Sequence, residues 1–130
     1  MNEDEVLEVM EEQDYKMFRP KNLMFLGRNI SVQYIEEGPW GPVVYGDFFM
    51  KEQRIRILEG LSPVEELDTF LHEIIHMVMA YMHVMMGEVD EEMITHRLAS
   101  GLSSVLVENP HVADYISAVS SFSSLDLSEE

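Results

Sequence analysis

Residues 62–87 read SPVEELDTFLHEIIHMVMAYMHVMMG, a stretch that predicts one long helix in the core of the fold. Ser62 suits an N-cap, Pro63 suits the first helical position, and Glu65 completes a capping box of the Ser-x-x-Glu type. Gly87 is the expected stop. Apolar residues recur between these ends at helical spacing and predict a broad buried face, made of Val64, Leu67, Leu71, Ile74, Ile75, Val78, Met79, Met82 and Met86.

Within this helix, residues 71–76 read LHEIIH and contain an HExxH motif. Side chains four residues apart share one face of a helix and lie about 6 Å apart along its axis, so the imidazoles of His72 and His76 can reach one metal ion. Glu73 projects beside that position. The motif therefore predicts a Zn²⁺ site with His72 and His76 as ligands and Glu73 as the group that activates a water molecule.

A catalytic zinc usually has three protein ligands and keeps one position open for water. The next predicted helix begins after Asp90 with Glu91 and Glu92, which would bring carboxylates near the metal if the two helices pack antiparallel. A competing interpretation is that these acids only interact with the dipole at the start of their own helix. At this point either Glu91 or Glu92 is a candidate for the third ligand.

His83 lies on the same side of the helix as His72, but at about 1.5 Å per residue it is roughly 10 Å beyond His76 and too far to share the metal. It is also one position later than the third histidine of the metzincin pattern, which excludes that class. We expect His83 at the rim of the site or as a helper in the cleft. Tyr45, His83 and His96 are candidates for stabilising an oxyanion.

Three or four strands are expected before the long helix. Residues 22–36 are rich in β-branched and aromatic side chains, with Gly27 as a turn or bulge between two strands. Residues 42–50 predict a further strand, in which Gly46 marks a bulge or a close approach of the backbone. Residues 53–58 alternate between arginine and isoleucine, as a half-buried strand does.

Two more helices are expected after the long one. The first begins at its N-cap Asp90 and ends before Pro110, and the second extends from about His111 to Phe122. We therefore expect an acidic N-terminal helix or arm over residues 1–18, a single α+β domain over residues 19–122, and a disordered acidic tail over residues 123–130.

The composition narrows the range of partners. The chain has 130 residues, 46% of them apolar, and carries 25 Asp and Glu against 8 Lys and Arg, which gives a formal charge of −17. Such a surface repels nucleic acid and anionic lipid, so neither is an expected partner. There is no cysteine, so a metal must be bound by histidine and carboxylate groups. The acidic N-terminus has no apolar segment typical of a secretory signal, and a cytoplasmic location is expected.

A wider pattern over roughly residues 26–110 resembles the minimal gluzincins of bacteriophages and their hosts, relatives of the ImmA/IrrE-type metallopeptidases. The resemblance rests on four parts of the sequence: a strand ending in Tyr45-Gly46, the strand over residues 53–58, the LHExxH run over residues 71–76, and Glu91-Glu92 followed by Leu98-Ala99-x-Gly101-Leu102.

The resemblance implies a zincin-like α+β fold, with a small antiparallel or mixed sheet of three to four strands packed on the HExxH helix and on a second ligand-bearing helix. It implies zinc-dependent hydrolysis of a peptide or protein substrate, in the cytoplasm of a bacterial host if the protein is phage-encoded. His72 and His76 would be ligands and Glu73 the general base. Glu92 would be the third ligand, because such families place it seven residues before the alanine that here is Ala99.

Many gluzincins have Asp or Asn one turn after the ligand glutamate, as a partner that orients a metal-binding side chain. Here that position is His96, which departs from the family pattern. Asp68 is one turn before His72 and is the substitute candidate for orienting an imidazole.

Two other classes remain open. A di-metal carboxylate bundle would use Glu73 and His76 as a Glu-x-x-His motif, but the second such motif is missing because Glu92 and His96 are spaced by four. The other class is a non-catalytic acidic binding protein, such as a DNA mimic or a phage regulatory protein, with a structural or vestigial metal site.

Overall fold

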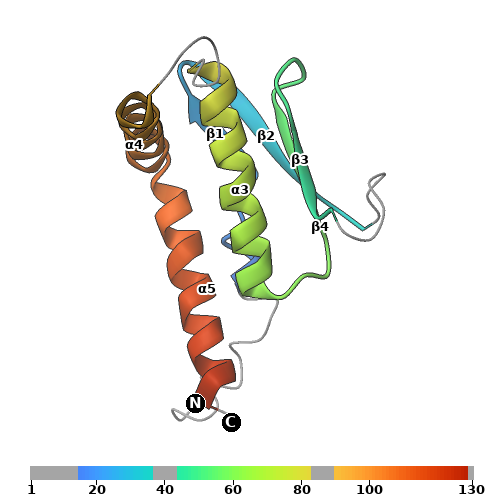
Figure 1. Ribbon diagram of the computed structural model, residues 1–130. Helices are drawn as coiled ribbons and strands as arrows, with labels where there is room; N and C mark the ends of the chain where they lie inside the picture. The colour runs from blue at the N-terminus through green and yellow to red at the C-terminus, as the bar shows by residue number, and fades with distance from the viewer. Residues whose placement is uncertain (1–14, 37–43, 83–89, 129–130) are drawn as a thin grey trace.

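A computed structural model describes residues 15–36, 44–82 and 90–128, with only the backbone of residues 123–128 described. A four-stranded mixed sheet has the order β1-β2-β4-β3, and helices α3, α4 and α5 follow it in the chain. In Figure 1, α3 lies across one face of the sheet, and α5 runs beside α3 on the side away from β3. The predicted α+β class is confirmed. None of the described helices is long and apolar enough to cross a membrane.

The first two strands form a hairpin. β1 (Asn22–Phe25) pairs antiparallel with β2 (Arg28–Ile35), and the two residues between them, Leu26 and Gly27, have positive φ angles of 50° and 77°. Two left-handed residues in a row suit the right-handed twist of a hairpin, and glycine adopts that geometry without strain. The predicted turn at Gly27 is confirmed.

The other two strands position the edge of the sheet. β4 (Arg54–Leu58) pairs parallel with β2 and antiparallel with β3 (Gly46–Phe49), which makes β3 an edge strand. Ile55 and Ile57 of β4 are fully buried, so the predicted alternation along this strand is confirmed. β3 is shorter than the strand predicted over residues 42–50, and residues 42 and 43 lie outside the described part of the chain.

Helix α3 (Pro63–Tyr81) begins as the sequence predicts, since the Ser62 hydroxyl oxygen accepts a hydrogen bond of 3.2 Å from the Glu65 backbone N–H. The predicted end at Gly87 is wrong. The backbone leaves helical geometry at Met82, with φ −97° and ψ 6°, and residues 83–89 are outside the description.

The predicted apolar face of α3 is only partly buried. Ile74 and Val78 are buried as expected, whereas Val64, Leu71 and Ile75 are 56%, 36% and 38% exposed. The sheet covers one side of α3 and the later helices cover another, so the sector that contains Leu71 and Ile75 faces solvent.

Helix α4 (Glu91–Glu108) is capped by Asp90, whose side chain accepts from the Met93 backbone N–H at 2.8 Å, and it ends before Pro110 as predicted. Figure 1 shows α4 nearly end-on while α3 lies along the picture, so the two helices cross steeply. Antiparallel packing, the condition under which Glu91 and Glu92 would lie near the metal, is therefore not met. Gly101 lets the two helices approach closely, because a Cβ there would lie 2.3 Å from Val78 Cγ1 of α3.

Helix α5 (Pro110–Ser128) extends past Phe122, where the sequence analysis placed its end, and includes most of the segment assigned to a disordered tail. No glycine or proline follows Pro110, so the sequence contains no residue that would stop the helix earlier. Tyr115 and Val119 of α5 pack against α3 in the core, where the Phe70 and Tyr115 rings meet edge to face at 5.6 Å.

Candidate metal centre

Two histidine side chains converge on the solvent-facing side of α3. His72 and His76 are four residues apart on the helix, and their Nε2 atoms are 3.1 Å apart. Two nitrogen ligands of one tetrahedral zinc lie about 3.3 Å apart, given Zn–N distances near 2.05 Å. The pair therefore fits a shared ion without a change of helix geometry, although two neutral imidazoles can also share a hydrogen bond at this separation.

Glu73 completes the group. Its carboxylate and the ring nitrogens of His72 and His76 offer ligand atoms that all lie within 4.8 Å of one another, an arrangement that could hold a metal ion. Unlike the two histidines, Glu73 is buried, with 3% of its surface exposed.

One oxygen of the Glu73 carboxylate lacks a hydrogen-bond partner in the described part of the chain. Its Oε2 atom is buried and has no hydrogen-bond partner among the described residues. Burial raises the pKa of Glu73, the neighbouring His72 lowers it, and Asp47 raises it, with a net upward shift. Because a buried carboxylate without a partner is unfavourable, this oxygen fits a site that receives a proton, a water molecule or a cation.

Gly46 allows the edge strand to pass directly over this carboxylate. A Cβ at this position would lie 2.8 Å from the Arg56 carbonyl oxygen, 2.9 Å from Thr69 Cγ2 and 3.4 Å from Glu73 Cγ. The predicted close approach at Gly46 is confirmed, and it fixes β3 against the HExxH segment of α3.

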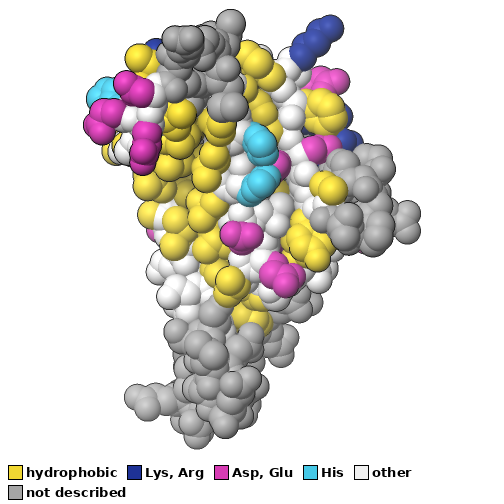
Figure 2. Space-filling model, viewed as in Figure 1, with side chains coloured by type: hydrophobic (Ala, Val, Ile, Leu, Met, Phe, Trp, Pro, Cys, Tyr) yellow, Lys and Arg dark blue, Asp and Glu magenta, His cyan; other side chains and the backbone are white. Residues whose placement is uncertain are grey.

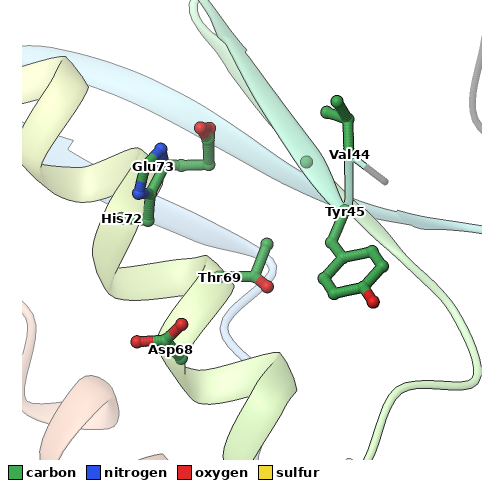
Figure 3. Close-up of a pocket in the computed structure, with 7 residues that line it drawn as sticks. Val44, Tyr45, Asp68, Thr69, His72 and Glu73 are labelled. Atoms are coloured by element: carbon green, nitrogen blue, oxygen red, sulfur yellow. The ribbon is translucent and has the colours of Figure 1, made fainter. Parts of the chain in front are cut away.

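Two adjoining pockets lie between α3 and β3, and both include His72 and Glu73. The smaller, of about 270 Å³, is drawn in Figure 3 and is lined by Val44, Tyr45, Gly46, Asp68, Thr69, His72 and Glu73. The larger, of about 550 Å³, is lined by Val44, Gly46, Asp47, Phe48, Met50, His72, Glu73, His76 and Ala80. Together they form a groove along the edge strand with Glu73 in its middle.

Some predicted site residues lie in this groove and others do not. Tyr45 and Asp68 line the smaller pocket, but no hydrogen bond joins Asp68 to the His72 ring in the described part of the chain. His83 lies outside the described residues.

The α4 candidates Glu91, Glu92 and His96 are exposed and are not in the His72–Glu73–His76 group. Figure 2 shows the histidine pair over the middle of α3, and acidic side chains gather over the visible end of α4, with apolar surface between the two. The steep crossing of the helices is the physical reason, because it turns the start of α4 away from the HExxH segment.

Several groove residues were missed by the sequence analysis. Thr69 is one turn before Glu73 and Ala80 is one turn after His76, so helical spacing from the motif would have found both. Phe48 and Asp47 follow Gly46 in the predicted strand. Only the pairing of β3 with β4 reveals that Asp47 faces Arg56, with hydrogen bonds of 3.0 Å and 2.5 Å.

Comparison with protein-family models, with curated proteins and with solved structures finds no match for this chain. The structure shows a small α+β protein in which helix α3 carries a His-Glu-His group beside a sheet edge. The resemblance to gluzincins therefore rests on the sequence motifs alone.

Proposed function

We propose that this protein is a zinc-dependent metallopeptidase of the HExxH type, gluzincin-like in its site and zincin-like in its fold. The observation that carries the proposal is the His72–Glu73–His76 group, in which two exposed imidazoles converge beside a buried carboxylate whose Oε2 is unpaired. Two neutral imidazoles and a nearby carboxylate are a donor set that suits Zn²⁺.

His72 and His76 would hold the zinc, and their position inside a capped helix limits how far either ring can move. Zinc held there supplies Lewis acidity, which lowers the pKa of water towards about 7 and polarises a peptide carbonyl group.

Glu73 acts as the proton carrier. It takes a proton from the attacking water and releases the same proton to the amine nitrogen that leaves when the peptide bond breaks. Burial supports both halves of this role, because it raises the pKa of Glu73 towards neutral pH. A carboxyl group with such a pKa both accepts and releases a proton readily.

The edge strand supports a peptide or protein as the substrate. At the opposite edge of the sheet, the Asn109 side chain bonds both the N–H and the C=O of Met24, at 2.8 Å and 2.9 Å, and covers β1. β3 is the other edge and borders the groove. An extended peptide that pairs with β3 would therefore cross directly over Glu73.

Zinc content tests the site directly. Purified wild-type protein should contain one equivalent of zinc, and His72→Ala or His76→Ala should lose it, while His111→Ala on α5 should keep it. Cleavage of a fluorescently labelled unfolded protein should follow the zinc content. Zinc retained by both site variants, or absent from the wild type, would overturn the proposal.

A second candidate function is a non-catalytic acidic binding protein, and the formal charge of −17 is what favours it. As a DNA mimic or phage regulatory protein, it would bind a basic partner through surface carboxylates. Such binding should weaken strongly with salt and should be unchanged by His72→Ala. Pull-down at low and high salt, with the wild-type and the His72→Ala protein, distinguishes this candidate from the peptidase.

A further inference from the structure

We propose that the groove selects an extended peptide with a cationic side chain in the smaller pocket and an apolar side chain in the larger one, on either side of the bond above Glu73. This inference rests on the proposed function and specifies its substrate class. Both pockets adjoin Glu73 and Gly46, so one peptide strand along β3 would reach both.

The smaller pocket has the chemistry of a cation site. Asp68 supplies an exposed carboxylate on the α3 side, without an ion pair in the described part of the chain, and no lysine or arginine lines the pocket. Figure 3 shows Thr69 directed from α3 towards the ring of Tyr45, which is 40% exposed. A carboxylate and an aromatic ring that line the same pocket suit the ammonium or guanidinium group of lysine or arginine.

An unpaired buried oxygen lies at the inner end of the same pocket. Glu73 also lines this pocket, and its buried Oε2 has no described partner, but the selection proposed here depends on Asp68. The described Asp68 carboxylate does not join a cluster that could hold a metal ion. A side-chain cation from a peptide therefore fits this pocket better than a second metal.

The larger pocket has one apolar wall, which lies beside the His72–Glu73–His76 group that lines the rest of it. Val44, Phe48, Met50 and Ala80 line it, and its one aspartate, Asp47, is held in a two-bond ion pair with Arg56. The apolar wall is held in place, because the Tyr81 hydroxyl donates to the Met50 carbonyl oxygen at 2.9 Å and the Phe48 and Tyr81 rings meet at 5.7 Å. A volume of about 550 Å³ is ample for a leucine or phenylalanine side chain.

The residues particular to each pocket lie at different positions along β3 and α3. Tyr45 and Asp68 lie at the start of β3 and early in α3, whereas Met50 and Ala80 lie after β3 and late in α3. The cationic and apolar positions are thus separated along the groove.

Peptide binding to the zinc-loaded Glu73→Gln protein tests the selection without hydrolysis. Labelled peptides would carry a central Leu-Leu-Lys-Lys or Lys-Lys-Leu-Leu, each compared with its Leu-Leu-Glu-Glu or Glu-Glu-Leu-Leu counterpart. In at least one order, the lysine peptide should bind about fivefold tighter or more. Added Asp68→Asn should remove most of this preference. Added Asp114→Asn, which changes the net charge equally but lies exposed on α5, should leave it intact.

The apolar pocket has its own pair of variants. Ala80→Asp should weaken binding of the leucine peptides relative to serine counterparts, whereas Ala113→Asp, at an exposed position on α5, should not. Equal effects from Asp68→Asn and Asp114→Asn, or from Ala80→Asp and Ala113→Asp, would overturn the inference.

Wild-type hydrolysis of the same peptides separates this inference from the proposed function. Cleavage of all peptides at equal rates would retain the peptidase and reject the selection. Selective binding without any cleavage would retain the selection and reject the peptidase.

Discussion

Glu73 combines two properties that are rarely found together in a glutamate: its side chain is 3% exposed, and one of its oxygens has no described partner. Folding has therefore placed a charged group where its desolvation is not offset by a hydrogen bond. Residues of this kind gather at functional sites, and the adjacent imidazoles support the proposed metal site.

Replacing Glu73 by glutamine tests the role of proton carrier. Glu73→Gln should retain one equivalent of zinc, because both imidazoles remain, and should lose hydrolysis by about 10²-fold or more, because the amide cannot accept the proton. Zinc analysis and peptide cleavage are the measurements, with Glu108→Gln on the exposed side of α4 as the matched control. Loss of zinc would instead make Glu73 a ligand and favour a di-metal site.

At the scale of elements, the site depends on how closely β3 approaches α3. Gly46 is the point of contact, and any side chain there would meet both the backbone of β4 and Thr69 of α3. The position of the edge strand over Glu73 is thus set by a residue with no side chain of its own.

Gly46→Ala should separate the strand from the helix. The added methyl group would lie within 3.0 Å of two neighbours, one of them backbone, so we expect a loss of about 1–3 kcal/mol in unfolding free energy. Peptide hydrolysis should fall while zinc content stays unchanged, since His72 and His76 both lie on α3. Thermal unfolding and zinc analysis would measure the two effects. Full activity in this variant would mean that β3 does not align the substrate.

Helix α4 provides the prediction on the third ligand. The resemblance assigns the third ligand to Glu92, but Glu91 and Glu92 are both exposed and lie outside the His72–Glu73–His76 group. We therefore expect Glu91→Ala and Glu92→Ala alike to leave zinc binding nearly intact, because an exposed acid in the first turn of a helix contributes only about 0.3–1 kcal/mol to the helix. Competition with a chelator measures the affinities. A marked loss of zinc affinity in Glu92→Ala but not in Glu91→Ala would instead make Glu92 the third ligand.

At the scale of the whole molecule, one buried polar cluster joins four parts of the chain. Glu66 of α3 is fully buried, accepts from Tyr115 of α5 at 2.6 Å and is paired with Arg19, which precedes β1. Arg19 also makes two hydrogen bonds, of 3.0 Å and 2.7 Å, to Glu59 in the loop before α3. Removing any member would leave the others with unmet charge or hydrogen bonds.

This cluster predicts a pH dependence of stability. The hydrogen bonds from Arg19 lower the pKa of Glu59 despite partial burial. A lowered pKa in the folded state stabilises the protein above the ordinary pKa of glutamate, near 4.3, and the contribution is lost as pH falls through the lowered value. Glu59→Gln should therefore cost about 1 kcal/mol at pH 7 and almost nothing near pH 2. Urea unfolding at both pH values would measure this, and a cost independent of pH would contradict it.

Local signals in the sequence predicted local structure well. Ser62, Asp90 and Gly27 each act through neighbours a few residues away, so the helix starts and the hairpin turn could be predicted from the residues alone. The HExxH group belongs to the same category, because helical spacing alone brings its side chains together.

Contacts between distant parts of the chain could not be predicted from the sequence. Glu66 had the appearance of an ordinary acid in the first turn of a helix, and its burial depends on Arg19, 47 residues earlier. The crossing of α4 over α3 likewise depends on how Gly101 meets Val78 and Met82. The position of the start of α4 relative to the histidines therefore could not be predicted.

The cover that Asn109 provides over β1 has a consequence for self-association. Exposed sheet edges are where folded chains pair with one another and begin to aggregate, and here the Asn109 side chain already occupies the Met24 backbone groups at one edge. Two copies that joined by strand pairing would therefore meet through β3, the edge that borders the groove. At high protein concentration such pairing would block the groove of both copies. A peptide bound along β3 would in turn prevent this self-association.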